Sequence, residues 1–426
     1  MTLQDLEFLY DLKREGIKLG LEVMREFSSK LGDRHREFGS FHVAGTNGKG
    51  SVSCFIYNIL SQKYNSGLYT SPHLVDFNER ILSGRSFIPD SYIENFISSN
   101  RNMIETLREK SRNPTFFETT TLMAFSYFAD TGAKYAAIEV GLGGRLDSTN
   151  IITPIVSVIT SIGYEHADKL GTSLTDIATE KAGIIKPGVP VVVSEGNAES
   201  VSAIKKIAIR NGSRMIQTDK SYKVSNAKIS LDGTSFDLES PLDRYHISTD
   251  LVGDFQIRNA VSAVAAMESA GLDKITSLDI ENGIFNSRWP ARMEILRKEP
   301  TVMVDCAHNP PAMTTLVGNY RKLTKEKPLL VVGIMKDKDI YGILSRLSEL
   351  SDSIIFTTPD EPERAADPSY LKRISDGMFT ETRVIADPVE AYSKSLDQSR
   401  PVLVTGSMYL VGIIKKMEKS DMRPFK

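Results

Sequence analysis

The sequence contains 426 residues, which is long enough for two or three domains. Hydrophobic residues make up 41% and charged residues 25%, and the net charge of −2 gives no overall attraction to nucleic acid or an anionic membrane. The two cysteines, Cys54 and Cys306, form no disulfide framework or zinc-ligand cluster. Because Met1–Tyr10 lacks an export signal and no apolar run reaches about 20 residues, we expect a cytoplasmic protein with no membrane or nucleic-acid partner.

Residues 5–31 carry apolar side chains at helical spacing and predict one amphipathic helix. After it, the apolar run Phe41–Ala44 predicts a strand, a glycine-rich turn follows, and Val52–Leu60 predicts a helix. Glycines let the backbone approach a polyphosphate, and the first amides of a helix point at an anion. Lys49 adds a positive charge, and Ser51 offers a hydroxyl to Mg²⁺. The spacing departs from G-x-x-x-x-G-K-[ST], so a plain glycine-rich turn is the alternative to a phosphate loop.

Strands and helices then alternate along the chain. Further strands are predicted at residues 67–70, 135–140, 155–160 and 189–193, and helices at 91–109, 116–129 and 255–270. Nearly continuous apolar strands that alternate with helices predict a mostly parallel sheet covered on both faces. Between Tyr222 and Leu251, short alternating runs around Asp232-Gly233 predict a hairpin, which we interpret as a small antiparallel extension at the edge of the sheet.

A domain boundary is predicted at Asn286–Arg292, which contains the only tryptophan and a proline. Beyond it the alternation restarts, with strands expected near residues 302–305, 329–332, 354–357, 383–385 and 402–404. We therefore predict an α/β fold in which a P-loop ATPase domain with a mostly parallel sheet (residues 1–287) precedes a smaller doubly wound, Rossmann-like α/β domain (residues 288–426).

Polar side chains follow several predicted strands, where ligands of parallel sheets gather. In the first domain these are Ser51, Ser71, Glu139 and His166. Together they suit a divalent cation held against a nucleotide, although histidine is an unusual ligand for Mg²⁺. The alternatives are a solvated edge residue for Glu139 and a helix cap for His166.

The second domain has its own polar cluster after a strand, Asp305 to Asn309. Asp305 could bind a ribose hydroxyl and His308 could reach a phosphate, or Asp305 and Asn309 could only cap the next helix. Because this cluster is far from the phosphate loop in sequence, an active site would lie between the domains.

The chain resembles the folylpolyglutamate synthase / dihydrofolate synthase family, within the Mur-ligase-like group of ATP-dependent amide-forming ligases. The resemblance covers nearly the whole chain, and each motif is weak alone but specific in this order. It is carried by residues 44–51, 69–74, 77–81, 115–118, 139–150, 180–186, 258–260, 289–292, 305–310 and 405–412. It also accounts for the spacing of the phosphate loop.

The resemblance implies a ligase that adds L-glutamate to dihydropteroate, a reduced folate or both through an acyl phosphate, with ATP and two Mg²⁺ ions, as a monomer. It implies catalytic roles for Lys49, His166 and Lys181, the last as its carbamate. ATP would contact Thr46, Asn47, Gly48, Lys49, Gly50, Ser51, Asn259, Arg292, Asp305 and His308. The metal ions would contact Ser51, Ser71, Glu139 and His166, and the pterin-bearing substrate would lie at Phe116, Phe117 and Asp147.

The sequence departs from the family's pattern at a few positions. Cys306 and Ala291 replace usual glycines, and Met408 stands where a bulky apolar residue is common. The residues before His166 lack the aspartate that often precedes it, a change that bears on substrate choice.

Three other functions would explain parts of the sequence. A peptidoglycan-type Mur ligase would need a separate N-terminal substrate domain, but only 44 residues precede Gly45. A P-loop nucleotide switch would explain Lys49, but the sequence has no N-K-x-D guanine signature. The third is a nucleotide-binding module without catalysis, which acceptor-dependent release of ADP would exclude.

Overall fold

The computed structural model describes residues 3–12, 16, 20–109, 112–361, 363–419 and 422–426. Its larger sheet has eight strands in the order β4-β3-β2-β5-β1-β6-β7-β8. They are β1 (Gly39–Ala44), β2 (Ser66–Tyr69), β3 (Ile81–Ser83), β4 (Ser86–Phe87), β5 (Tyr135–Glu139), β6 (Val156–Ile159), β7 (Val191–Val193) and β8 (Met215–Gln217). The five junctions from β2 to β8 are parallel, and β3 and β4 pair antiparallel at one edge. The predicted, mostly parallel sheet is confirmed.

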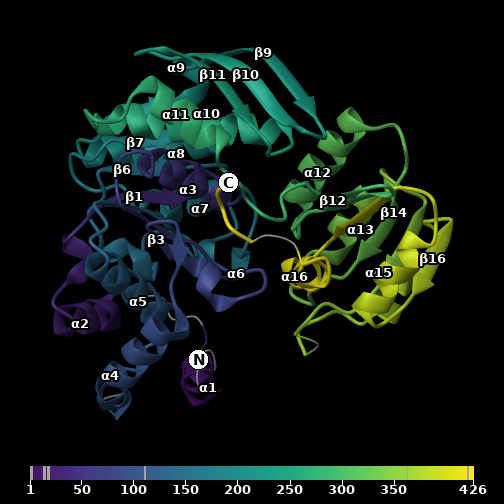
Figure 1. Ribbon diagram of the computed structural model, residues 1–426, viewed down its shortest axis with the longest axis horizontal. Coiled ribbons are helices and arrows are strands. Elements are labelled where there is room, and N and C mark those ends of the chain that lie inside the picture. Colours follow the sequence, from purple (N-terminus) through teal and green to yellow (C-terminus); the bar gives the residue numbers. More distant parts are fainter. Residues whose placement is uncertain (1–2, 13–15, 17–19, 110–111, 362, 420–421) are drawn as a thin grey trace.

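Helices cover both faces of this sheet (Figure 1). One face packs against α3 (Lys49–Leu60), α10 (Asp254–Ala270) and α11 (Ser277–Phe285). The other carries α4 (Asp90–Glu109), α5 (Phe116–Asp130) and the two N-terminal helices, and α7 (Leu174–Ala182) and α8 (Ala198–Arg210) pack near β6 and β7. Short elements complete the domain: η2 (Arg34–Arg36), η3 (Phe77–Arg80), η4 (Ser148–Ile151), α6 (Ala167–Leu170) and α9 (Thr218–Ser221).

The N-terminal region differs from the single helix predicted over residues 5–31. It contains two helices, α1 (Leu3–Asp11) and α2 (Glu22–Lys30). Gly16 and Gly20, which lie between them, have φ values of 70° and 153°, outside the helical region. Ile17, which belonged to the predicted apolar pattern, lies outside the described residues.

The antiparallel part of the fold is a separate sheet. Strands β9 (Lys223–Ser230), β10 (Gly233–Glu239) and β11 (Arg244–Thr249) pair in the order β11-β10-β9. The predicted hairpin at Asp232-Gly233 is therefore confirmed, but its placement on the edge of the large sheet is wrong. The inner face of this sheet is buried in the same core as α10 and α11, through Phe236, Leu238 and Ile247. These apolar side chains are therefore buried although the sheet does not pair with the edge of the large sheet.

A six-stranded sheet follows, in the order β12-β13-β17-β14-β15-β16. Its strands are β12 (Glu294–Lys298), β13 (Thr301–Val304), β14 (Leu329–Val332), β15 (Ser353–Phe356), β16 (Glu381–Val384) and β17 (Val402–Thr405). All neighbours are parallel except the edge strand β12. Two cores cover its faces, with α12 (Pro310–Leu323), α13 (Ile340–Ser348) and α14 (Pro368–Ile374) in one and α15 (Pro388–Leu396) and α16 (Met408–Met417) in the other. This confirms the predicted doubly wound second unit.

The last described residues, 422–426, return to the first sheet's core. Phe425 is buried there and pairs with Ser287, while the carbonyl of Pro424 accepts a hydrogen bond from Asn58 of α3. The C-terminal end accordingly lies beside α3 in Figure 1. The boundary near residue 287 stays a prediction. None of the described helices has the length and apolar character needed to cross a membrane.

Candidate active site

A cavity of about 490 Å³, called here the central cavity, is lined by loops that follow strands of both large sheets. It collects most of the residues predicted for the site. These are Thr46, Asn47, Gly48, Lys49, Gly50, Ser51, Ser71, Glu139, His166, Lys181, Asn259, Arg292, Asp305 and His308. Residues that follow the carboxyl ends of parallel strands were expected to lie together, and in the structure they do.

The phosphate loop joins β1 to α3 at the centre of the larger sheet. Gly48 caps the helix with φ of 91°, a conformation that favours glycine. A Cβ atom on Gly45 would lie 1.8 Å from the Thr160 hydroxyl, and one on Gly50 would lie 2.6 Å from the Trp289 ring. Glycine is thus required by the turn and by close packing. The first amides of α3 begin a helix of 12 residues, which is the geometry that binds phosphate.

Lys181, in α7, is only 3% exposed although it lines the central cavity. Its Nζ donates to the backbone carbonyl of Gly45 at 2.8 Å. Burial lowers the pKa of Lys181 to about 7, and the positive charge of Lys49 acts in the same direction. The neutral amine is therefore available near neutral pH.

The side chains predicted to hold metal, Ser51, Ser71, Glu139 and His166, all line the central cavity. Ser51 and Glu139 are buried, and Glu139 accepts a hydrogen bond from the Ser71 amide at 3.1 Å. Burial raises the pKa of Glu139, while the charges of Lys49 and other cations oppose that shift. One carboxylate and two hydroxyls are oxygen donors of the kind that Mg²⁺ prefers, so this set fits one ion that keeps several waters. No three His, Cys, Asp or Glu side chains of the described chain gather closely enough to bind a metal by themselves.

The second sheet contributes Asp305, which follows β13. Its carboxylate accepts hydrogen bonds from the amides of Ala307 at 2.7 Å and Met293 at 2.9 Å, and burial raises its pKa. The side chain of Asn309 caps α12 by accepting from Ala312. Asp305 thus ties the segment that contains Arg292 to the loop that follows β13. Asp305 and Arg292 both line the central cavity.

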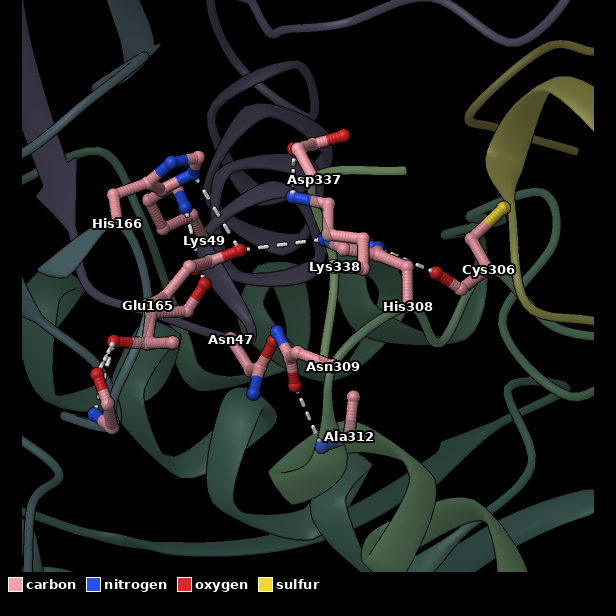
Figure 2. A network of polar contacts seen from close by, with 12 residues as sticks. Asn47, Lys49, Glu165, His166, Cys306, His308, Asn309, Ala312, Asp337 and Lys338 are labelled. Carbon is pink, nitrogen blue, oxygen red and sulfur yellow. Dashed lines mark hydrogen bonds and ion pairs between the residues drawn. The ribbon is translucent and has the colours of Figure 1, made fainter. Parts of the chain in front are cut away.

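Glu165 joins the two sides of the central cavity, a contact that the sequence did not predict. Its Oε1 lies 3.3 Å from Nε2 of His308 and 3.7 Å from Nε2 of His166 (Figure 2). Burial opposes ionisation of Glu165, but the hydrogen bond from His308 and the charge of Lys49 outweigh it, so its pKa falls well below the usual range. The only signal in the sequence was its place beside His166, after a strand.

Two cations of the second unit were also missed by sequence reasoning. Lys338 and Arg364 line the central cavity, together with Tyr409, whose hydroxyl accepts a hydrogen bond from Arg364 at 3.3 Å. Lys338 pairs with Asp337 at 3.3 Å. Neither cation follows a predicted strand directly, so nothing in the local pattern marked them.

The residues predicted for the pterin-bearing substrate lie outside the central cavity. Phe117 packs against Gly141, where a Cβ would meet its ring at 2.4 Å, and Phe116 stacks on Tyr10 at 5.8 Å. The carboxylate of Asp147 accepts hydrogen bonds from the amides of Leu142 and Thr149. These side chains support the wall of the central cavity from behind. A second cavity of about 510 Å³ adjoins it, and its lining includes Tyr10.

Comparison with known proteins identifies the family. The model of the Mur ligase middle domain matches residues 43–267, and that of the Mur ligase, glutamate ligase domain matches residues 291–408. The dihydrofolate synthase/folylpolyglutamate synthase of Bacillus subtilis is 32% identical over 414 residues, which are 95% of this chain and 96% of that protein. This chain belongs to the folylpolyglutamate and dihydrofolate synthase family.

Solved structures of family members have the same fold. The folylpolyglutamate synthase of Thermotoga maritima aligns with a TM-score of 0.88 at 33% identity, covering 99% of this chain and 98% of that one. The Mycobacterium tuberculosis folylpolyglutamate synthase complexed with ADP aligns with a TM-score of 0.91 at 28% identity, covering 99% of each chain.

The two positions where this family member lacks a usual glycine differ in backbone conformation. Ala291 has φ of 60°, in the left-handed region that favours glycine, and it is fully buried. Cys306 is not among the residues with positive φ, and its side chain is buried in the core that contains β13 and β17. Of these two residues, only Ala291 therefore has a strained backbone conformation.

Proposed function

We propose that this protein is an ATP-dependent ligase that joins L-glutamate to the carboxylate of a folate-type acceptor and releases ADP and phosphate. The observation that carries the proposal is that the phosphate loop and the Asp305–His308 segment line one cavity. The names of the relatives, which are folylpolyglutamate and dihydrofolate synthases, support glutamate and dihydropteroate or a reduced folate as the partners.

The chemistry requires activation of the acceptor. A carboxylate oxygen attacks the γ-phosphorus of ATP and ADP leaves, which gives an acyl phosphate. The amine of glutamate then attacks the acyl carbon, loses a proton and expels phosphate. Phosphoryl transfer needs alignment and neutralisation of charge more than covalent help, and Lys49, Arg292 and the first amides of α3 would supply these.

One Mg²⁺ ion would be held by Ser51, Ser71 and Glu139. A second ion would be held by Glu139 and His166. When bound, Mg²⁺ neutralises charge on the phosphate oxygens. A second ion would need another anionic ligand, and Lys181 would become one as its carbamate, since its neutral amine is available to add CO₂.

The other residues would surround the three substrates, which are ATP, L-glutamate and the acceptor. Thr46, Asn47, Gly48, Gly50, Asn259, Asp305 and His308 would contact the nucleotide. Lys338 and Arg364 would bind the carboxylates of the incoming glutamate, because they add positive charge to the second unit's side of the cavity. Phe116, Phe117 and Asp147 would shape the acceptor's end of the site.

Two units suit this chemistry because an acyl phosphate hydrolyses in water. Closure of residues 288–426 on residues 1–287 would exclude water from the cavity. Because a single chain supplies both sides of the cavity, we propose that the enzyme works as a monomer. We also propose that it is cytoplasmic.

The decisive experiment supplies the purified protein with ATP, Mg²⁺, L-glutamate and either dihydropteroate or tetrahydrofolate. We expect ADP release that depends on one or both acceptors, and a product heavier by one glutamyl residue by mass spectrometry. ADP release that ignores both acceptors and glutamate would refute the proposal.

A further inference from the structure

His42, in β1, is a fully buried histidine that the proposed ligase chemistry does not use. Its Nε2 lies 2.8 Å from the hydroxyl of Thr149 in η4. Its Nδ1 is sealed from solvent and has no hydrogen-bond partner among the described residues. Because a buried polar atom without a partner costs folding stability, an apolar side chain of similar size would fill this position at lower cost.

The hydrogen bonds of Thr149 define which way this contact runs. The Thr149 hydroxyl donates its only hydrogen to Oδ1 of Asp147. It must therefore accept from His42, so the imidazole carries its proton on Nε2 and is neutral. Burial lowers the pKa of His42 to about 3, which agrees with a neutral ring near pH 7. The two side chains thus form a directed chain that ends on the Asp147 carboxylate.

The Asp147 carboxylate in turn holds the loop that follows β5. Its Oδ2 accepts a hydrogen bond from the Leu142 amide at 2.8 Å, and its Oδ1 accepts one from the Thr149 amide at 3.0 Å. The Thr149 hydroxyl binds Oδ1 as well, and this second hydrogen bond is the one that depends on His42. Without it the buried carboxylate would be less firmly oriented toward Leu142.

The loop that Asp147 holds is part of the wall of the central cavity. Residues 141–143 line this cavity, and so do Glu139 before them and Lys181 from α7. The next residue, Gly144, lies against the backbone of α7, where a Cβ would be 2.8 Å from the Lys181 carbonyl oxygen. A shift of residues 141–143 would therefore change the shape of the cavity between Glu139 and Lys181.

This loop is closer to the proposed acceptor end of the site than to the nucleotide. A Cβ on Gly141 would lie 2.4 Å from the Phe117 ring, so the loop packs tightly on a residue proposed to shape the acceptor's end. The phosphate loop has hydrogen bonds of its own, because Asn47 donates to the Ser161 hydroxyl at 3.2 Å and accepts from Thr160 at 2.7 Å. Loss of the His42 chain should therefore affect the acceptor more than the nucleotide.

We propose that His42 is a positioning residue, which acts through Thr149 and Asp147 to fix residues 141–143 as the wall against which the acceptor binds. This role rests on the proposed ligase function. A neutral N–H donor suits the task, because it satisfies the hydroxyl without placing a charge in the core of the sheet. His42 itself touches no substrate, and its effect is exerted through the shape of the loop.

The test breaks the chain at each of its first two links. Binding of the acceptor that supports turnover, dihydropteroate or tetrahydrofolate, is measured by calorimetry on the full-length protein with Mg²⁺ and a non-hydrolysable ATP analogue. In His42→Leu and in Thr149→Val the Kd of the acceptor should rise at least fivefold, while that of the ATP analogue stays within twofold. His42→Gln, whose amide can donate from a similar position, should recover most of the affinity. The double variant should bind no more weakly than the weaker single variant, because both changes break one chain.

Several results would overturn the proposal. They are a smaller rise of the acceptor Kd in the folded variants, an equal rise for the ATP analogue, and a His42→Gln protein as weak as His42→Leu. If only one single variant folds, that variant decides. Failure of both to fold would also contradict the proposal, because the chain would then be structural.

Ser157→Ala is the matched control. Ser157 is fully buried, pairs with His42 between β6 and β1, and donates to the Ile184 carbonyl at 3.1 Å. This variant loses a buried hydrogen bond outside the chain and should keep the wild-type acceptor affinity. If wild type itself shows no acceptor-dependent release of ADP, the proposed function fails rather than this inference alone.

The tautomer of His42 can be measured without any substrate. In protein labelled with nitrogen-15 histidine, the signals missing from His42→Gln identify this ring. They should show a protonated Nε2 and a bare Nδ1, unchanged from pH 6 to 8 because the pKa is about 3. A ring protonated on Nδ1 alone would overturn the proposal, since His42 could not then donate to Thr149.

Discussion

Lys49 and Lys181 donate to the same backbone carbonyl, that of Gly45, at 3.1 and 2.8 Å. Lys49 is the first residue of α3 and Lys181 lies in the last turn of α7, so two helices direct positive charge at one oxygen of the phosphate loop. The repulsion adds to burial in lowering the pKa of Lys181 to about 7. An ordinary lysine is almost wholly protonated at that pH, whereas about half of Lys181 is neutral there.

We predict that Lys181→Ala is nearly inactive and that millimolar bicarbonate or a short carboxylic acid partly restores it. The reason is that the proposed carbamate provides a negative charge that alanine lacks and a small anion can replace. The measurement is the initial rate of acceptor-dependent ADP release. Lys186→Ala is the matched control, because burial lowers the pKa of Lys186 to about 8 but the residue does not line the central cavity. Full activity of Lys181→Ala without additive, with an unmodified Lys181 in crystals grown with ATP and Mg²⁺, would refute the role.

The carbamate should also depend on pH in a definite direction. Only the neutral amine adds CO₂, so loading should fall as the pH is lowered through about 7, where Lys181 becomes protonated. Carbon-13 NMR with labelled bicarbonate measures the carbamate signal directly, and the signal should be missing from Lys181→Ala. A signal that is constant from pH 6 to 9 would contradict this account.

We predict that Lys49→Ala loses about 2–4 kcal/mol of transition-state stabilisation, as for other electrostatic donors. Folding should persist, because among the described residues the Lys49 amine donates hydrogen bonds only to the carbonyls of its own loop, those of Gly45 and Thr46. The measurement is kcat/KM together with circular dichroism. Normal turnover by a folded variant would show that this is not the phosphate loop of the active site.

Much of the fold follows from local patterns. The run Phe41–Ala44 is apolar except for His42 because β1 is buried between two helical layers, and glycines follow because the turn leaves no room for Cβ atoms. Because parallel strands end at one edge of the sheet, the positions of Ser71 and Glu139 at strand ends predicted that they lie close together.

Other features depend on distances that no local pattern contains. Glu165 and His308 are 143 residues apart, and their contact arises only when the two sheets face each other. The break between α1 and α2 was missed because the apolar spacing continues across it. Asp147 was predicted at the substrate, but its hydrogen bonds to Leu142 and Thr149 also give it a task in holding its own loop.

We predict that Ala291→Gly is neutral or stabilising, because glycine adopts this left-handed conformation without the cost of about 1–2 kcal/mol that an alanine has there. Glycine's greater freedom in the unfolded chain offsets part of this gain. Urea denaturation provides the measurement. The control is Ala265→Gly in α10, equally buried but helical, which should lose about 1 kcal/mol or more. Equal losses at the two positions would show that Ala291 is not strained.

The last prediction concerns Lys415 of α16, which is fully buried and has its Nζ 2.6 Å from both carboxylate oxygens of Glu294. Glu294→Gln should cost about 3–5 kcal/mol of folding stability, because it leaves a buried cation without its counter-ion. Lys415→Met should cost much less, since the Glu294 side chain is 28% exposed and water can solvate it. The double variant should then resemble Lys415→Met.

Urea denaturation of the three variants measures these losses of folding stability. The control is Arg297→Met, which removes a more exposed ion pair with Glu418 and should lose under about 1 kcal/mol. Because Glu294 also accepts a hydrogen bond from the Ala291 amide at 2.7 Å, Glu294→Gln should additionally lower activity through the loop that carries Arg292. Equal losses for Glu294→Gln and Lys415→Met would mean that the buried charge is not what makes the pair important.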